Sequence, residues 1–262
     1  MPHQCCDYAV FTETSLDHAI LVLRLLALLQ EFVESKVQTM LVHLLYESGH
    51  ASSLHQRSLA ARDAFAYSLL WTTGLRGINA REVCCSDFWL PATESCPSQP
   101  AMSSLYPVFT LSIGSKVELV PQRLKTSISA NAASVQLCVQ PVMLTDPLQW
   151  LHILLHCSQE AGTPISNILL RPETRDKAGF QEKFLQNPSL HGRLTKLLKQ
   201  LQLYEGESLH SFRRGVAQQM QAAGVPSADI LQQLLIKTPK VLHNCYLPAG
   251  RHESEVKRVR HA

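Results

Sequence analysis

The stretch "LHQRSLAARDAFAYSLLWTTGLRG" occupies residues 54–77 and contains a strong helical pattern. Its apolar residues recur at helical spacing, and Gly74 is a plausible C-cap at its end. Arg76 follows in the turn, with a second glycine behind it. An arginine so placed can point from a rigid support into a cleft. A cation that complements the dipole at a helix C-terminus explains Arg76 equally well.

The flanking patterns predict a mainly helical fold with a small antiparallel sheet, an α+β architecture. Upstream, Thr14 and Asp17 resemble a capping box, and a helical pattern runs through Leu45. Downstream, the period changes to two, which predicts a hairpin. The later segments alternate helices with polar loops. The predicted elements are a Pro/Ser-rich loop at 91–107, strands within 115–127 and 133–140 around a turn at 128–132, helices at 146–162 and 191–204 flanking a loop at 171–181, a helix from Leu209, a turn at 224–226 and a helix at 228–236.

These elements form one predicted domain. We expect a flexible N-terminus at 1–14, a single domain at 15–250 and a basic tail at 251–262. No internal repeat is visible. Hydrophobic residues make up 45% and charged residues 17% of the 262, a balance that permits a sizeable core and argues against a disordered chain.

The charge distribution and the cysteines limit the classes of function that the chain could have. Residues 1–150 carry a net charge of −3 and residues 151–262 a net charge of +6, so the C-terminal half suits a polyanionic partner. The eight cysteines include no C-x-x-C pair, and we interpret them as reduced thiols of an intracellular protein. The most apolar run, 19–29, is too short to span a bilayer and contains Arg24. No membrane association and no secretory signal are expected.

The stretch "SLHSFRRG" offers a candidate anion site near the start of a helix. His210 and Arg213 are three residues apart and share a helical face, where the helix dipole also favours an anion. Arginine presents a planar fork to phosphate oxygens, and imidazole exchanges a proton near neutral pH. Taken alone, the motif is more typical of a solvated basic helix start with His210 half buried. Arg214 points about 100° away from Arg213, which suits a backbone contact or a salt bridge.

Two further residues, Lys125 and Tyr246, are candidates for chemistry at a phosphate group. Lys125 in "QRLKTS" lies where a strand enters the hairpin turn, so its ammonium could swing over a substrate or stay solvated at the sheet edge. Tyr246 in "LHNCYLPAG" follows a helical segment. It is either a packing residue or a nucleophile that phosphate-bound cations activate.

No metal or cofactor is expected. His152 and His156 lie at i and i+4 with Cys157 adjacent, a pattern that either forms one edge of a metal site or consists of ordinary core and surface histidines. The chain has no H-E-x-x-H, no phosphate-cradling G-x-x-x-x-G-K-S/T, no G-x-G-x-x-G and no G-x-S-x-G.

Taken together, "RDAFAYSLLWTTGLRG", "RLKTS", "LHSFRRG" and the following tyrosine closely resemble, in order and spacing, the catalytic domain of tyrosine recombinases, the Cre, Xer and phage-integrase group. The separation of 33 positions between Arg213 and Tyr246 fits that family, and the resemblance covers residues 54–250. The amino-acid sequences of these motifs are most similar to those of eukaryotic mobile-element recombinases of the DIRS type and their algal relatives. The domain at 15–250 is therefore expected to adopt the tyrosine recombinase catalytic fold.

The resemblance implies DNA cleavage and rejoining, as in site-specific recombination or integration. Tyr246 would attack a phosphodiester to give a 3′-phosphotyrosyl intermediate, with Arg76 and Arg213 stabilising the developing charge. Lys125 would protonate the departing 5′-oxygen, and His210 would help move the tyrosine proton. No metal is needed. Contacts with the DNA backbone are expected from Arg123, Arg214 and Lys240. The implied partner is double-stranded DNA with a homo-oligomer assembled on it, in the nucleus of a eukaryotic host and otherwise in the cytoplasm.

Three departures from the family pattern accompany this resemblance. Ile236 and Lys237 stand where the family usually has Gly followed by His or Trp, and Lys237 is a possible substitute donor to phosphate. Asn79 stands where an acidic residue commonly orients the first arginine, here Arg76. Residues 16–45 resemble the catalytic domain's own first helices, so the N-terminal DNA-clamp domain is expected to be absent or truncated.

Two alternatives follow from these departures. One is a catalytically inactive DNA-binding relic that uses the same cationic cleft. The other is a helical interaction protein whose match to the family is fortuitous.

Overall fold

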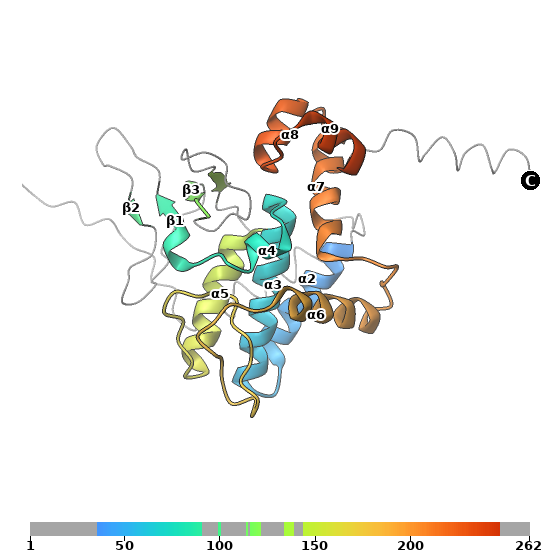
Figure 1. Ribbon diagram of the computed structural model, residues 1–262. Helices are drawn as coiled ribbons and strands as arrows, with labels where there is room; N and C mark the ends of the chain where they lie inside the picture. The colour runs from blue at the N-terminus through green and yellow to red at the C-terminus, as the bar shows by residue number, and fades with distance from the viewer. Residues whose placement is uncertain are drawn as a thin grey trace, which may run out of the picture.

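The computed structural model describes residues 36–90, 99–100, 114, 116–121, 134–138 and 144–246, without side chains for 99, 100 and 245. Within them, helices surround a small antiparallel sheet (Figure 1), which confirms the predicted fold class. The predicted N-terminal segment 1–14, the hairpin turn and the basic tail lie outside the described residues. None of the described helices combines the length and the apolar character needed to cross a membrane.

Helix α3 (Leu54–Thr73) forms the centre of the domain, between α2 (Lys36–His50) and α5 (Pro147–Glu160) (Figure 1). Most of its residues from Ser58 onward are buried, including the polar Arg62, Asp63 and Ser68, because neighbouring helices cover it on both sides. The hydroxyl of Ser53 caps its start, and Gly74 ends it in the left-handed conformation, with φ of 63°. The predicted helix and its glycine C-cap are thus confirmed.

The sheet has the strand order β2-β1-β3-β4, and every neighbouring pair is antiparallel. The predicted hairpin strands pair with Val117 opposite Leu137, and both side chains are buried. The strand β1 was not predicted, because three residues are too few to show a periodic pattern. The strands are β1 (Phe88–Leu90), β2 (Gln99–Pro100), β3 (Lys116–Leu119) and β4 (Val135–Cys138). A short 3-10 turn, η1 (Cys85–Asp87), leads into β1.

The C-terminal helices differ from their predicted bounds mainly at α6. It runs over Asn187–Gln200 instead of 191–204, and Pro188 in its first turn explains the earlier start, because proline is favoured there. Helix α7 (Leu209–Ala222) begins where predicted, with Ser208 as N-cap. Three short elements follow: α8 (Ser227–Gln233), α9 (Pro239–Val241) and the π-helical turn η2 (Leu242–Tyr246). They lie together beyond the C-terminal half of α7 (Figure 1).

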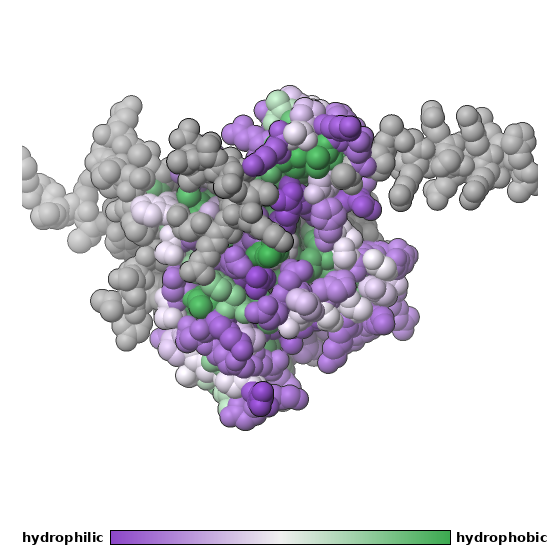
Figure 2. All heavy atoms as spheres, viewed as in Figure 1, coloured by the Kyte–Doolittle hydropathy of each residue, from purple (hydrophilic) through white to green (hydrophobic). Residues whose placement is uncertain are grey.

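Two apolar clusters divide the interior. The larger unites α2, α3, the sheet, α5, α6 and the start of α7. The smaller lies between α7 and the segment that follows it, and Tyr246 is one of its members. Trp71 packs against both clusters and so connects the central helix to the C-terminal segment. In the view of Figure 2, hydrophilic side chains cover α6, while apolar groups show beneath α8 and α9.

Candidate active site

The site is built on the first two turns of α7. The direction in which each side chain points from this helix determines whether it is buried or exposed. Leu209 and Phe212 face the larger core, and the Phe212 ring stacks on that of Tyr67 with centroids 5.9 Å apart. Arg213 lies on the buried side of the helix, whereas Arg214 is exposed. The predicted divergence of the two arginines is therefore seen in the structure.

Glycines allow α7 to approach its neighbours closely. A Cβ on Gly215 would lie 2.8 Å from Cζ3 of Trp71, and one on Gly77 would lie 2.9 Å from Cδ1 of Leu209. At Gly74, a Cβ would lie 2.1 Å from Cδ2 of Leu234, in addition to the strain of its positive φ. The glycines of "TTGLRG" and "FRRG" thus bring the end of α3 against α7 and α8.

Arg213 is held by three acceptors from three separate parts of the chain. Its Nε donates to the hydroxyl of Tyr246 at 3.1 Å, and one terminal nitrogen donates to the carbonyl oxygen of Gly74 at 2.7 Å. The other terminal nitrogen donates to the carbonyl oxygen of Leu234. A guanidinium has five N–H groups, so two remain for a further acceptor.

The charge of Arg213 lacks a carboxylate partner among the residues that the structure describes. The other two fully buried arginines are paired: Arg62 with Asp63, and Arg171 with Glu182. Burial lowers the pKa of Arg213, and the positive charge of Arg76 lowers it further, while Tyr246 opposes both effects. A buried cation whose protein partners are all neutral favours an anion nearby.

Tyr246 is a core residue whose hydroxyl faces the site. The side chain is 3% exposed, and the turn η2 holds it in the smaller apolar cluster. The guanidinium carbon of Arg213 lies 5.2 Å from its ring centroid. Since its oxygen accepts from Arg213, the hydroxyl proton points elsewhere.

His210 also contacts the Tyr246 ring. The two ring centroids are 5.1 Å apart, at an interplanar angle of 41°. Burial lowers the pKa of His210, and neighbouring positive charges lower it further. Those charges, in decreasing order of effect, belong to Arg213, Arg214 and Arg76. The imidazole is therefore neutral at physiological pH and can accept a proton.

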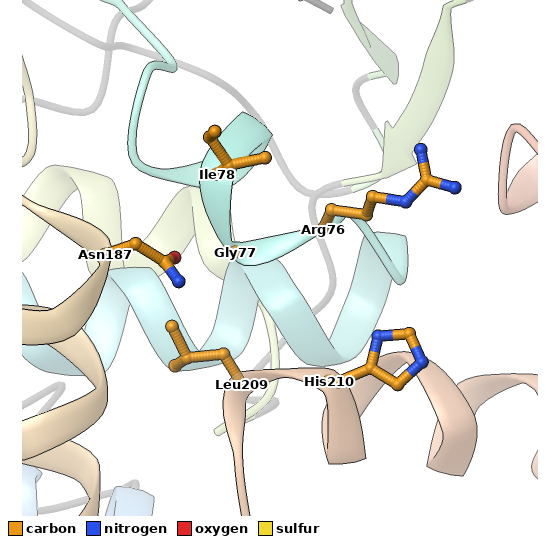
Figure 3. Close-up of a pocket in the computed structure, with 6 residues that line it drawn as sticks. All are labelled: Arg76, Gly77, Ile78, Asn187, Leu209 and His210. Carbon is orange, nitrogen blue, oxygen red and sulfur yellow. The ribbon is translucent and has the colours of Figure 1, made fainter. Parts of the chain in front are cut away.

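Arg76 reaches this site from the turn after α3. Its backbone is fixed because its carbonyl oxygen accepts from the amides of Asn79 and Ala80, at 2.8 and 2.9 Å. With His210 it lines an open cavity of about 310 Å³ that also includes Gly77, Ile78, Asn187 and Leu209. Figure 3 shows the Arg76 and His210 side chains extending to the same side, away from Asn187.

The structure therefore brings together four of the six predicted catalytic residues. These are Arg76, His210, Arg213 and Tyr246. Lys125 lies outside the described residues, as does Arg123. Lys237 is exposed in the segment between α8 and α9, and Lys240 is exposed in α9.

The departures at Asn79 and Ile236 have structural consequences. Asn79 is buried, and its Oδ1 accepts no hydrogen bond within the described part of the chain. That oxygen therefore does not orient Arg76 as the family's acidic residue would, and the backbone of the turn positions Arg76 instead. Ile236 is buried in the smaller apolar cluster, so it replaces glycine with a core side chain.

The histidine and cysteine pattern of α5 does not assemble a metal site. The described residues contain no group of three potential His, Cys, Asp or Glu ligands. His156 pairs with Glu160, and burial raises the pKa of the Cys157 thiol to about 12.

The helical arrangement around a small antiparallel sheet is the fold of tyrosine recombinases. No family model matches the chain, and no curated protein is significantly similar to it in sequence. The XerH site-specific recombinase bound to difH substrate, in a pre-cleavage complex, matches with a TM-score of 0.52 and 13% identity, over 84% of this chain and 50% of that chain. XerH bound to palindromic difH substrate, in a post-cleavage complex, matches with a TM-score of 0.51 and 13% identity, over 86% and 52%. The chain thus spans about half the length of the solved chains.

Three contributors to the site were not predicted from the sequence. The carbonyl oxygens of Gly74 and Leu234 accept hydrogen bonds from Arg213. Every residue has such an oxygen, so the sequence does not indicate which ones act as acceptors. Asn187 enters the cavity lining from a helix more than a hundred positions after Arg76. Its only sequence signal is the Asn-Pro pair that opens α6.

Proposed function

We propose that this protein cleaves and rejoins DNA strands through a covalent 3′-phosphotyrosyl intermediate. The observation that carries this proposal is the hydrogen bond between Arg213 and Tyr246. It joins Arg213, a buried cation whose partners among the described residues are all neutral, to the tyrosine that the order of the motifs selects. The fold that the chain shares with XerH supports the same conclusion.

The chemistry follows from the groups around Tyr246. The Tyr246 oxygen attacks the phosphorus atom, and the bond from phosphorus to the 5′-oxygen breaks. The tyrosine proton passes to His210, directly or through water. Arg213 and Arg76 stabilise the negative charge that develops on the non-bridging oxygens; losing one such donor typically costs about 3 kcal/mol.

The remaining step needs a proton for the departing 5′-oxygen, and Lys125 is the proposed donor. The attack of that 5′-hydroxyl on the phosphotyrosine then restores the DNA strand, and no energy cofactor is consumed. Lys237 is proposed as an additional donor to a phosphate oxygen, because it is exposed and lies in the segment that leads to Tyr246.

Double-stranded DNA is the proposed partner, bound by a homo-oligomer of this chain. Arg214 and Lys240 are exposed close to the site and are proposed to contact the DNA backbone, together with Arg123. The motif sequences "RDAFAYSLLWTTGLRG" and "HSFRRG" support an origin in a eukaryotic mobile element, which would place the protein in the nucleus.

A covalent trap tests the cleavage step. The protein is incubated with a pool of nicked duplexes of randomised sequence, in which the cleaved fragment diffuses away and the adduct accumulates. A protein–DNA adduct resistant to denaturation is expected from the wild type and absent from Tyr246→Phe. Tyr204→Phe is the matched control, because Tyr204 is a surface residue outside the site. An adduct that persists in Tyr246→Phe would refute the assignment.

The inactive relic is a distinct outcome of the same experiment. Its supporting observation is the burial of Tyr246, which is only 3% exposed and therefore poorly accessible to a phosphodiester. DNA binding without an adduct in any member of the pool would establish the relic.

A further inference from the structure

The hydroxyl of Thr73 joins the end of α3 to the turn that carries Arg76 and leads into the short helix α4 (Gly77–Ala80) (Figure 3). Thr73 is the last residue of α3 and is fully buried. Its Oγ1 donates to the carbonyl oxygen of Leu69, one helical turn earlier, at 2.6 Å. The same oxygen accepts from the backbone N–H of Leu75 at 3.2 Å. The Thr73 side chain therefore fixes the orientation of a peptide group just beyond the helix.

The peptide group between Gly74 and Leu75 is held at both of its edges. Its N–H donates to the Thr73 hydroxyl, and its carbonyl oxygen accepts from a terminal nitrogen of Arg213 at 2.7 Å. The N–H and the carbonyl of a trans peptide lie in one rigid plane and point in opposite directions. Rotation of this plane would break both hydrogen bonds together. The orientation that Thr73 gives to the peptide is thus the one that Arg213 requires.

The hydrogen bonds continue from this peptide to the proposed nucleophile. Arg213 donates through Nε to the hydroxyl of Tyr246 at 3.1 Å, from the same planar guanidinium that donates to Gly74. A continuous chain therefore runs from the carbonyl oxygen of Leu69 through the Thr73 hydroxyl, the peptide and the guanidinium to the tyrosine. Hydrogen bonds in such a chain polarise one another. Loss of the hydroxyl at one end should weaken the hydrogen bond at the other.

We propose that Thr73 is a positioning residue for strand cleavage, which acts through this peptide on Arg213. The Thr73 hydroxyl keeps the carbonyl of Gly74 directed at the guanidinium. The guanidinium in turn keeps its Nε–H on the hydroxyl of Tyr246 and its charge at the place where the phosphate reacts. The inference rests on the proposed function, because the reaction that Thr73 serves is the attack by Tyr246.

Substitutions at Thr73 separate positioning from packing. Thr73→Val keeps the shape of the side chain but removes the hydroxyl, so the buried N–H of Leu75 loses its acceptor. Thr73→Ser keeps the hydroxyl and removes a methyl group, so it preserves the chain of hydrogen bonds and loosens the packing. A packing role predicts the larger effect from Thr73→Ser, whereas a positioning role predicts it from Thr73→Val.

Ser68 provides the matched control on the same helix. It is also fully buried, and its Oγ donates to the carbonyl oxygen of Phe65 at 3.0 Å. Ser68→Ala therefore removes a buried hydroxyl that bonds to a carbonyl oxygen of α3, as Thr73→Val does. The position of Ser68 lies before the last turn of the helix, so the peptide that holds Arg213 is left intact.

The first measurement follows the exchange of the Arg213 Nε–H with water, by NMR of the free protein with isotopically labelled arginine. The signal is assigned by its disappearance in Arg213→Lys. The Nε–H of Arg62, which donates to Asp63 at 3.1 Å, is the internal reference for global opening. Thr73→Val is expected to speed the exchange of Arg213 about tenfold relative to Arg62. Thr73→Ser and Ser68→Ala are expected to leave this ratio unchanged.

The second measurement is the rate of covalent adduct formation on the nicked duplexes, with their affinity. Thr73→Val is expected to slow adduct formation about tenfold at saturating DNA. The affinity is expected to stay unchanged, because the lost contact serves the charge that develops during the reaction. If Thr73→Val does not fold, Thr73→Ala removes the same hydroxyl and carries the same expected results.

The outcomes distinguish this inference from the proposed function. An unchanged exchange ratio in Thr73→Val, an equal change in Thr73→Ser or Ser68→Ala, or a wild-type rate of adduct formation in Thr73→Val overturns the positioning role. If the exchange of Arg213 responds as expected but the wild type forms no adduct, the effect of Thr73 on Arg213 stands and the cleavage function fails. If the wild type forms the adduct and Thr73→Val alters neither measurement, the reverse holds.

Discussion

Replacing Gly215 by alanine tests whether the close approach of α7 to α3 positions the site. Alanine in a helix interior is ordinarily more favourable than glycine by about 1 kcal/mol. At Gly215 the added Cβ would lie 2.8 Å from Cζ3 and 3.4 Å from Cη2 of Trp71. Ordinary carbon contacts lie at about 3.5–4.0 Å, so the indole or the helix must move.

The net effect is the difference between these two contributions. Inserting a methyl group into a packed contact typically costs about 1–3 kcal/mol. After subtraction of the helix gain of about 1 kcal/mol, Gly215→Ala is expected to lower the free energy of unfolding by about 1 kcal/mol. Trp71 connects the two apolar clusters, and Arg213 is two residues from the substitution, so activity is expected to fall as well.

Gly192 in α6 supplies the control for this comparison. It is also interior to a helix of 14 residues, and its Cβ would meet no atom within 4 Å. Gly192→Ala is therefore expected to stabilise the protein by about 1 kcal/mol. The free energies of unfolding of Gly215→Ala and Gly192→Ala, measured in urea, should differ from each other by about 2 kcal/mol. This corresponds to a difference of roughly 4–8 °C in melting temperature.

Equal stabilisation by the two substitutions would refute the argument from packing. It would show that α7 and Trp71 separate without cost, and that "FRRG" has no packing requirement for glycine. A destabilised Gly215→Ala with wild-type DNA cleavage would refute only the connection between packing and the site.

Three further predictions concern other parts of the structure. Asp63 is buried and pairs with two arginines, so Asp63→Asn should lower the free energy of unfolding by about 3 kcal/mol in urea. The lowered pKa of His210 makes protonation unfavourable in the folded state. The free energy of unfolding should therefore be unaffected above pH of about 6.5, fall as the pH drops from there to the lowered folded-state pKa, and level off below it; His210→Gln should remove this fall in unfolding curves across pH. Burial raises the pKa values of Cys85 and Cys157 to about 12, so iodoacetamide at pH 8 should modify these thiols only after unfolding.

The sequence predicted the fold where a pattern was long or chemically specific. The central helix ending at Gly74 and the start of α7 at Leu209 have both periodicity and capping residues, and both are confirmed. The pairing of β3 with β4 followed from period-two alternation. The three-residue strand β1 was missed because so short an element carries little periodic signal, and the start of α6 at Asn187 is marked only by Pro188 in its first turn.

The candidate site was predicted from the order and spacing of the motifs, because the chemistry of each single residue left its role open. Composition could not show that Arg213 is buried with only neutral partners, because burial depends on how α7 packs against the end of α3. Nor could it show that the Asn79 oxygen is unpaired or that Asn187 shares a cavity with Arg76. These contacts join segments far apart in the chain, and only the tertiary structure defines them.

The central claim is that the groups around Arg213 direct Tyr246 to a DNA phosphodiester. The most direct measurement is mass spectrometry of the covalent adduct after digestion with protease and nuclease. The account predicts one modified peptide, with a nucleotide joined through its 3′-phosphate to Tyr246. A nucleotide on another residue, a linkage through the 5′-phosphate, or unmodified Tyr246 in a protein that binds the randomised nicked pool would contradict it.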